Sequence, residues 1–231
     1  MKAHAFIFAR GGSKGVPRKN IRLFNNVPLL GHSIKLAQEL SVIEHVFVST
    51  EDAEIAQVAE NYSGAVIHRP VSLALDETPE WLAWQHAIRW VEDRYGTFDL
   101  FLSLPPTSPL RSKVDVERCV TALDDDTDII VAVTESRRSP WFNIVTETDS
   151  GHLRCVIESK YRLDRRQDCP LAYDLTTVAY VARPNFIKTS NGLFDGRVKG
   201  VQVPPERAVD IDTTLDFEIA EFLATRQSDS L

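Results

Sequence analysis

The sequence has few cysteines and no long apolar run, and both absences exclude classes of protein. Its three cysteines, Cys119, Cys155 and Cys169, share no metal-ligand spacing, and an odd number argues against a disulfide framework. No apolar run approaches the roughly 18 residues that span a bilayer. The run Ala5–Ala9 is too short for a signal-peptide core and ends in arginine and glycine. We therefore expect a cytoplasmic protein with no membrane partner.

Acidic residues are missing from the first 38 positions, although the whole chain carries a net charge of −7. That segment holds seven Lys and Arg residues, so the rest of the chain carries the entire acidic excess. The overall charge gives no reason to expect a nucleic-acid partner. The uneven distribution favours a compact anion bound near the start of the chain. A solvated basic face is the alternative.

Strand-like and helix-like stretches alternate through the first 134 residues. The apolar run Ala3–Ala9 is typical of a strand buried on both faces, and 29–40, 53–62, 80–95 and 114–123 have helical spacing. This rhythm predicts an α/β fold with a mostly parallel sheet flanked by helices, and ligands at the carboxyl ends of its strands. Short β-like pieces follow Ser136. We predict one domain, 1–231, with an inserted β arm at 137–171.

A glycine-rich, cationic loop, Arg10–Asn20, follows the first predicted strand. Glycines permit positive φ and let backbone amides approach an anion, while lysines, arginines and Ser13 supply charge and a hydroxyl. The loop matches neither the Walker A pattern nor Gly-x-Gly-x-x-Gly. Its position after a buried strand indicates phosphate binding. A glycine turn with solvent-facing lysines is the alternative.

Two aspartates, Asp210 and Asp212, lie just before the last predicted helix. In extended backbone, residues i and i+2 project on the same side, so both carboxylates can reach one hard cation. With a triphosphate loop in the same chain, the pair predicts an Mg²⁺ site. The alternative is that Asp212 caps the helix, which needs no metal.

The loop Ile7–Asn20 resembles the signature of the CMP-acylneuraminate synthetases, the sialic-acid-type cytidylyltransferases. Further similar motifs follow in order, at 30–34, 48–50, 69–76, 86–87, 106–111 and 210–216. The resemblance implies a Rossmann-like nucleotidyltransferase fold that transfers CMP from CTP to an acidic α-keto sugar and releases pyrophosphate. An Mg²⁺ ion at Asp210 and Asp212 would neutralise charge on the phosphates.

Site residues follow from the resemblance position by position. The implied catalytic residues are Arg10, Lys19 and Asp212, with Asp212 or a metal-bound hydroxide beside it as the general base. The implied nucleotide-binding residues are Phe8, Ala9, Arg10, Gly11, Gly12, Ser13, Lys14, Lys19, Asn20, Arg69, Thr78 and Glu80. The implied sugar-binding residues are Pro105, Thr107, Ser108, Arg166, Tyr173, Asp174 and Tyr180.

The sugar side departs from the family pattern at three positions. Pro105 stands where the family has glutamine, Asp174 where it has arginine, and Thr177 where it has glycine. A carboxylate in place of a guanidinium inverts the local charge, so we expect a relative of sialic acid rather than N-acetylneuraminate as acceptor. Alternatively, Asp174 pairs with Arg165 or Arg166. Trp81 and Trp84 are expected in the core or in a dimer contact.

In the resembling family the inserted arm crosses to a second subunit, which implies a homodimer. Other functions remain open from the sequence. An octulosonate or another small acid would share the reaction but not the acceptor. A metal-dependent glycosyltransferase would use the same Asp-x-Asp pattern, and a nucleotide-sensing module would bind without catalysis.

Overall fold

The computed structural model describes residues 1–161 and 163–228, with a seven-stranded sheet at the centre. The sheet order is β11-β7-β10-β6-β1-β4-β5. Its strands are β1 (Ala3–Phe8), β4 (Ile43–Thr50), β5 (Ala65–His68), β6 (Leu100–Ser103), β7 (Ile129–Glu135), β10 (Tyr173–Ala182) and β11 (Val198–Gln202). Only β10 runs antiparallel to its neighbours in this sheet, so the predicted mostly parallel sheet is confirmed.

Alternating side chains of β1 pack into two hydrophobic cores, one on each face of the sheet. Ala5 and Ile7 pack toward helices α1 (Leu29–Glu39), α2 (Ala53–Asn61) and α4 (Lys113–Thr121). Phe6 and Phe8 pack on the other face toward α3 (Glu80–Tyr95) and α5 (Pro184–Thr189). The continuous apolar run in the sequence is therefore explained by burial on both faces.

Local capping signals fix the starts of two helices. The Asp52 side chain accepts hydrogen bonds from the backbone N–H groups of Glu54 and Ile55, at 2.9 and 3.0 Å, and so begins α2. Ser112 and Asp115 form a reciprocal capping box at the start of α4. The short helix α5, which starts at Pro184, was not among the predicted elements.

A third core holds the last helix, α6 (Thr214–Ser228), against the start of the chain. Its anchor is the hairpin of β2 (Leu23–Phe24) and β3 (Val27–Pro28), which the periodicity did not predict. The two turn residues between these strands both have positive φ. Phe24 packs edge-on against Phe217, and Ile211 lies in the same cluster. This packing fixes the segment 210–212 beside the first loop.

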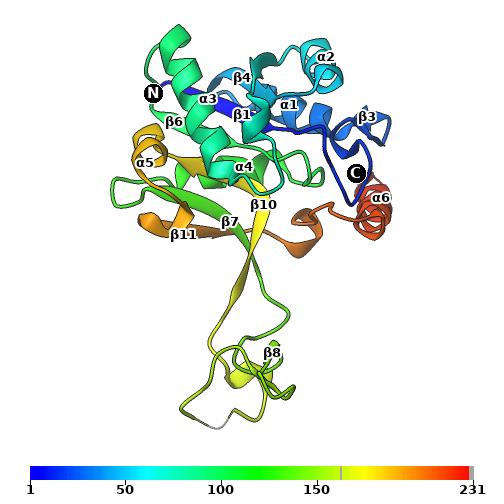
Figure 1. The fold of residues 1–231 in the computed structure, drawn as a ribbon, viewed down its shortest axis with the longest axis vertical. Coiled ribbons are helices and arrows are strands. Elements are labelled where there is room, and N and C mark those ends of the chain that lie inside the picture. The colour runs from blue at the N-terminus through cyan, green and yellow to red at the C-terminus, as the bar shows by residue number, and fades with distance from the viewer. Residues whose placement is uncertain (162, 229–231) are drawn as a thin grey trace.

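The segment between β7 and β10 leaves the body as a long arm (Figure 1). It carries a small hairpin, β8 (Val145–Glu147) with β9 (Leu153–Cys155). The predicted insertion, 137–171, falls within this segment, and Arg162 lies outside the described residues. The arm sends the chain out along β7 and returns it along β10, which explains why β10 is antiparallel.

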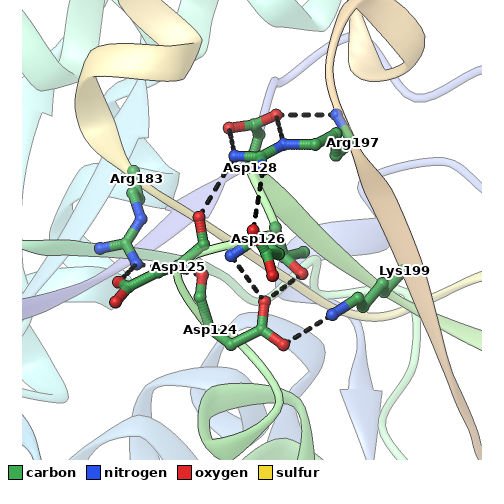
Figure 2. Close-up of polar contacts among 8 residues, drawn as sticks. Asp124, Asp125, Asp126, Asp128, Arg183, Arg197 and Lys199 are labelled. Atoms are coloured by element: carbon green, nitrogen blue, oxygen red, sulfur yellow. Dashed lines mark hydrogen bonds and ion pairs between the residues drawn. The ribbon is translucent and has the colours of Figure 1, made fainter.

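The acidic run before β7 belongs to a surface ion-pair network (Figure 2). Lys199 on β11 pairs with Asp124 at 2.6 Å, and Arg197 pairs with Asp128 at 3.1 Å. The other two aspartates, Asp125 and Asp126, pair with Arg183 and Arg197. Because a lysine or arginine side chain pairs with every carboxylate of the run, the network ties the edge strand β11 to its neighbours.

No helix in the described part of the chain has the length and apolar character needed to cross a membrane.

Candidate active site

A cavity of about 590 Å³ opens at the carboxyl ends of β1, β5 and β6. Parallel α/β sheets place their ligands at this edge. The cavity brings together side chains from the first loop, from the segment 69–80, from the turn after β6 and from 210–212. Of the residues predicted for the site, those lining it are Phe8, Arg10, Ser13, Lys14, Lys19, Asn20, Arg69, Thr78, Glu80, Pro105, Thr107, Tyr180, Asp210 and Asp212.

Several cavity residues were not assigned a role from the sequence. Gly15, Leu73, Ala74, Leu75, Asp76, Pro106 and Thr177 also line the cavity. Among the residues predicted to bind nucleotide or sugar from these segments, Ala9, Gly11, Gly12 and Ser108 do not line it. Ala9 is fully buried, and its N–H donates to the carbonyl of Ser49. Phe8 and Ala9 therefore end the strand at the cavity, while only Phe8 reaches it.

Close packing, not positive φ, explains the glycine at position 15. A Cβ atom there would lie 2.0 Å from the carbonyl oxygen of Asp212, so only glycine lets the loop approach that segment. The expected positive φ at the loop glycines is wrong, because the positive φ within the loop belongs to Arg18. Arg18 turns away from the cavity and pairs with Asp52 at 2.6 Å and with Glu54 at 2.5 Å.

Two cations of the loop share one carboxylate from the opposite wall of the cavity. The Asp76 carboxylate accepts from Arg10 at 2.7 Å and from Lys14 at 2.5 Å. The bond from Lys14, together with the charge of Arg10, lowers the pKa of Asp76, so the carboxyl is ionised at neutral pH. Asp76 thus closes the segment 70–78 over the loop through its negative charge.

A largely shielded carboxylate, Glu51, organises the same end of the cavity. It accepts from the backbone N–H of Gly11 at 2.7 Å and from Arg69 at 2.9 Å. Arg69 is 5% exposed and Glu51 is 15% exposed, so this pair is largely shielded from solvent. Asn20 is also buried, and its side-chain amide donates to the carbonyl of Arg10 at 2.9 Å. Both contacts hold the backbone of the loop rather than leaving it free.

The two aspartates of the Asp-x-Asp pattern both face the cavity, as their spacing predicted. Lys19 donates to the Asp212 carboxylate at 2.9 Å and to the carbonyl of Ile211 at 2.6 Å. The alternative considered for Asp212, a helix cap, is not found. Thr213 exchanges hydrogen bonds with Asp216 instead, so the cap lies one residue later and Asp212 is left for Lys19.

Asp210 has the features of a side chain that binds a cation. Its Oδ1 atom is buried and has no hydrogen-bond partner. Burial raises the pKa of Asp210, and the nearby Asp212 carboxylate adds to this, while the hydroxyls of Thr107 and Thr177 act in the opposite direction. A cation bound at this oxygen would remove the cost of burying the charge.

The residues present fit an Mg²⁺ ion shared with a triphosphate. Proteins bind Mg²⁺ through one or two carboxylates, with substrate phosphates and water completing the octahedron. Asp210 and Asp212 supply that number of carboxylates beside Arg10, Ser13 and Lys19. Within the described residues no group of three or more His, Cys, Asp or Glu side chains is placed to hold a metal on its own.

The far end of the cavity is lined by hydroxyl groups. Thr177 Oγ1 lies 3.2 Å from Thr107 Oγ1 and 2.6 Å from Ser108 Oγ, so Ser108 supports the wall from behind. Burial raises the pKa of Tyr180 to about 12, with Glu80 and Asp210 adding to the shift. Glu80 lines the cavity. The protein atoms that surround its carboxyl group shield it from water, and this burial raises the pKa of Glu80.

The two tryptophans of α3 lie in the core, which is one of the two places that the sequence analysis gave for them. Trp81 and Trp84 are 8% and 4% exposed, and neither lines the cavity. The Trp81 indole N–H donates to the carbonyl of Ser190 at 2.8 Å. Their bulk therefore supports the cavity wall through packing between α3 and the sheet.

Three predicted sugar-binding residues lie outside the cavity, in or beside the arm. Tyr173 and Asp174 begin β10 and are exposed, and Arg166 donates to the carbonyl of Arg137. The alternative considered for Asp174, an ion pair with Arg165 or Arg166, is not found in the described part of the chain. Those arginines are held by other carboxylates, Arg165 by Asp168 at 2.9 Å and Arg166 by Glu135 at 4.0 Å.

Comparisons with known proteins agree with this geometry. A family model described as cytidylyltransferase matches residues 4–79. The chain is 34% identical to the CMP-N,N'-diacetyllegionaminic acid synthase of Campylobacter jejuni and 33% identical to the post-translational flagellin modification protein B of Campylobacter coli. Each match covers 94% of this chain and 92% of the relative.

The fold is also found in a solved structure, that of a CMP:2-keto-3-deoxy-manno-octonic acid synthetase in complex with CTP. The two chains superpose with a TM-score of 0.72 at 17% identity, over 98% of this chain and 100% of the other. At this identity the likeness concerns the fold alone. The predicted Rossmann-like nucleotidyltransferase fold is confirmed.

Proposed function

The chain belongs to the cytidylyltransferase family, and we propose that it transfers CMP from CTP to the anomeric hydroxyl of a nonulosonic acid, with release of pyrophosphate. The observation that carries the proposal is one cavity in which Arg10, Lys14 and Lys19 face the carboxylates of Asp210 and Asp212. Cations that hold a triphosphate and carboxylates that hold its metal ion are both needed for nucleotidyl transfer.

The first loop binds the triphosphate. Arg10 and Lys14 exchange Asp76 for phosphate oxygens, and the Ser13 hydroxyl donates to the same anion. Gly15 keeps the loop against Asp212, so the phosphates arrive beside the metal carboxylates. The cytosine lies at the end of β1, between Phe8 and the segment Thr78–Glu80, where Arg69 lines the wall.

The chemical step is an in-line displacement at the α-phosphorus of CTP. The anomeric oxygen of the sugar forms a bond to phosphorus, and the bond from phosphorus to the bridging oxygen of pyrophosphate breaks. Arg10 and Lys19 stabilise the negative charge that develops on the leaving pyrophosphate. Asp210 and Asp212 would hold an Mg²⁺ ion, which would supply neutralisation of the charge on the phosphate oxygens when bound.

Asp212 is the proposed general base that accepts the proton of the anomeric hydroxyl. Its side chain is 71% exposed toward the cavity and is released when Lys19 turns to the phosphates. Asp212→Ala is expected to lower kcat by a factor of about 100 or more. An Asp212→Ala protein with near-normal turnover at saturating Mg²⁺ would exclude this role.

The acceptor is proposed to be a relative of sialic acid, such as a legionaminic acid. The 34% identity to a CMP-N,N'-diacetyllegionaminic acid synthase supports this class, as do Pro105 and Thr177 at the sugar end. The test is pyrophosphate release from CTP and Mg²⁺ with a panel of nonulosonates and an octulosonate. A clear preference for N-acetylneuraminate or the octulosonate would overturn the assignment. Absence of pyrophosphate release with every acid would favour a glycosyltransferase or a binding module.

We further propose that the chain is one domain and acts as a homodimer in which the arm completes the partner's sugar site. The arm exposes apolar side chains, including Phe142 at 38% and Leu153 at 68%. Arg166 and Asp174 on and beside the arm lie outside the chain's own cavity, which is consistent with a role in the partner's cavity. Sedimentation at micromolar concentration tests the dimer, and a monomer there would count against it.

Mixed dimers test the shared site directly. Lys19→Ala and Arg166→Ala would each inactivate a homodimer. If Arg166 acts in the partner's cavity, a heterodimer has one site in which both residues are intact, and an equal mixture regains about a quarter of wild-type activity. If Arg166 acts in its own chain, the mixture stays inactive.

The three free cysteines support a cytoplasmic location.

A further inference from the structure

Arg111 is a buried arginine behind the turn that lines the sugar end of the cavity. It is 6% exposed, and it lies between that turn and helix α4. Its Nε donates to the carbonyl of Ser108 at 2.7 Å, and its Nη2 donates to the carbonyl of Pro105. The opposite side of the same turn presents Pro105, Pro106 and Thr107 to the cavity. Arg111 therefore holds a cavity wall without touching the cavity.

The turn is also hydrogen-bonded to the backbone of the segment that carries Asp210 and Asp212. The N–H of Ile211, the residue between Asp210 and Asp212, donates to the carbonyl of Thr107 at 2.9 Å. The hydroxyl of Thr177 joins Thr107 to Ser108. Any shift of the turn is thus transmitted to the backbone that carries Asp210 and Asp212.

The charge of Arg111 is costly where it lies, unless it has a partner. Arg111 Nη1 and Asp210 Oδ1 are both buried atoms without a hydrogen-bond partner in the described structure. Burial lowers the pKa of Arg111 to about 9, and the Asp210 carboxylate opposes this shift. A methionine would fill the space without a buried charge, so packing alone does not explain a guanidinium here.

We propose that Arg111 is a positioning residue for the proposed metal site, because it fixes from behind the turn 105–108, which in turn holds the backbone between Asp210 and Asp212. This inference rests on the proposed function only for the identity of the cation site. Arg111 orients the carboxylates through the turn, while the cation itself would bind at Asp210 and Asp212. Residues that orient metal ligands in this way typically change metal affinity about 10- to 100-fold when they are replaced.

The test is Mn²⁺ binding to the CTP complex, measured from the free Mn²⁺ signal in electron paramagnetic resonance without any acceptor. Arg111→Met is expected to weaken Mn²⁺ binding at least 10-fold, which corresponds to about 1.4 kcal/mol. Binding of CTP without metal should change less than twofold, because Arg111 touches neither the first loop nor the cytosine end. In turnover, the Mg²⁺ concentration for half-activation should rise while KM for CTP at saturating Mg²⁺ stays constant.

Arg207 provides the matched control. It forms a bidentate pair with Asp115 at 2.7 and 2.9 Å, also near the start of α4, but its hydrogen bonds go to that carboxylate and not to the turn 105–108. Arg207→Met should lower thermal stability and leave Mn²⁺ affinity unchanged. Equal weakening by Arg207→Met and Arg111→Met would assign a purely structural role to Arg111 and overturn the proposal.

Arg111→Lys covers the case in which the methionine variant does not fold. Lysine keeps the charge but cannot hold both carbonyls, so Mn²⁺ binding should weaken about two- to fivefold. Wild-type Mn²⁺ affinity in a folded Arg111→Met or Arg111→Lys protein would refute the inference. If wild-type protein with CTP binds no Mn²⁺, the proposed metal site is wrong, which is a different outcome from a failure of Arg111.

Discussion

Replacing Asp76 by asparagine should tighten CTP binding, because the Asp76 carboxylate occupies cations that the triphosphate needs. In the structure Asp76 pairs with Arg10 at 2.7 Å and with Lys14 at 2.5 Å, and all three side chains are at least 37% exposed. Asparagine keeps the size of the side chain and removes the charge. The triphosphate then no longer has to break two ion pairs before it binds.

The magnitude follows from the exposure of these pairs. One exposed ion pair typically changes an equilibrium constant by a factor of about 1.5 to 5. The two pairs share a single carboxylate and are not fully additive, so we expect Asp76→Asn to lower the Kd for CTP about 3- to 10-fold. Screening should shrink the difference from wild type between 0.05 and 0.5 M salt, since the Debye length falls below about 5 Å at the higher value.

Isothermal titration of CTP without metal measures this effect, and Glu54→Gln is the matched control. Glu54 pairs with Arg18 of the same loop at 2.5 Å, but neither side chain lines the cavity. The control removes the same charge from the protein, so it should leave the Kd for CTP within twofold of wild type. Unchanged or weaker CTP binding in Asp76→Asn would refute the reasoning, because Asp76 would then hold the cations in a productive position.

Other variants and reagents give further predictions. Asp210→Asn should abolish Mn²⁺ binding yet raise the melting temperature in chelator at pH 7.5. The raised pKa of Asp210 means that ionisation costs folding stability above the ordinary carboxyl range, and the difference should shrink toward pH 4. Glu51→Gln should cost about 3 kcal/mol in urea unfolding, because it breaks the buried pair with Arg69. Native protein should react with Ellman's reagent at two of its three thiols, because burial raises the pKa of Cys119 to about 12.

Elements with strong local signals were predictable from the sequence. β1 follows from a continuous apolar run, and α2 follows from the Thr50–Asp52 capping signal. The direction of β10 has no such signal, because it depends on where the arm returns the chain to the sheet. The β2–β3 hairpin was missed although Asn25 and Asn26, both with positive φ, mark its turn.

The candidate site likewise has features that a local sequence pattern predicts and contacts that depend on the tertiary fold. The loop Arg10–Asn20 and the pair Asp210 and Asp212 could be recognised because each is a local pattern. The sequence does contain the signal for the true helix cap, because Thr213 and Asp216 have the Thr-x-x-Asp spacing of a capping box. The alternative of a cap at Asp212 overlooked this spacing. Asp76 was missed as a partner of the loop because that contact exists only once two distant segments meet.

Arg69 and Lys19 both pair with carboxylates, but these carboxylates differ in their exposure to solvent. This difference predicts which ion pair breaks first when CTP binds. The partner of Arg69 is buried, whereas Asp212, the partner of Lys19, is 71% exposed. An arriving triphosphate therefore takes Lys19 from Asp212 and leaves Arg69 in place. The freed Asp212 carboxylate would then stand beside Asp210, so CTP binding is expected to make the second carboxylate of the proposed metal site available. By linkage, metal binding must strengthen CTP binding by the same factor.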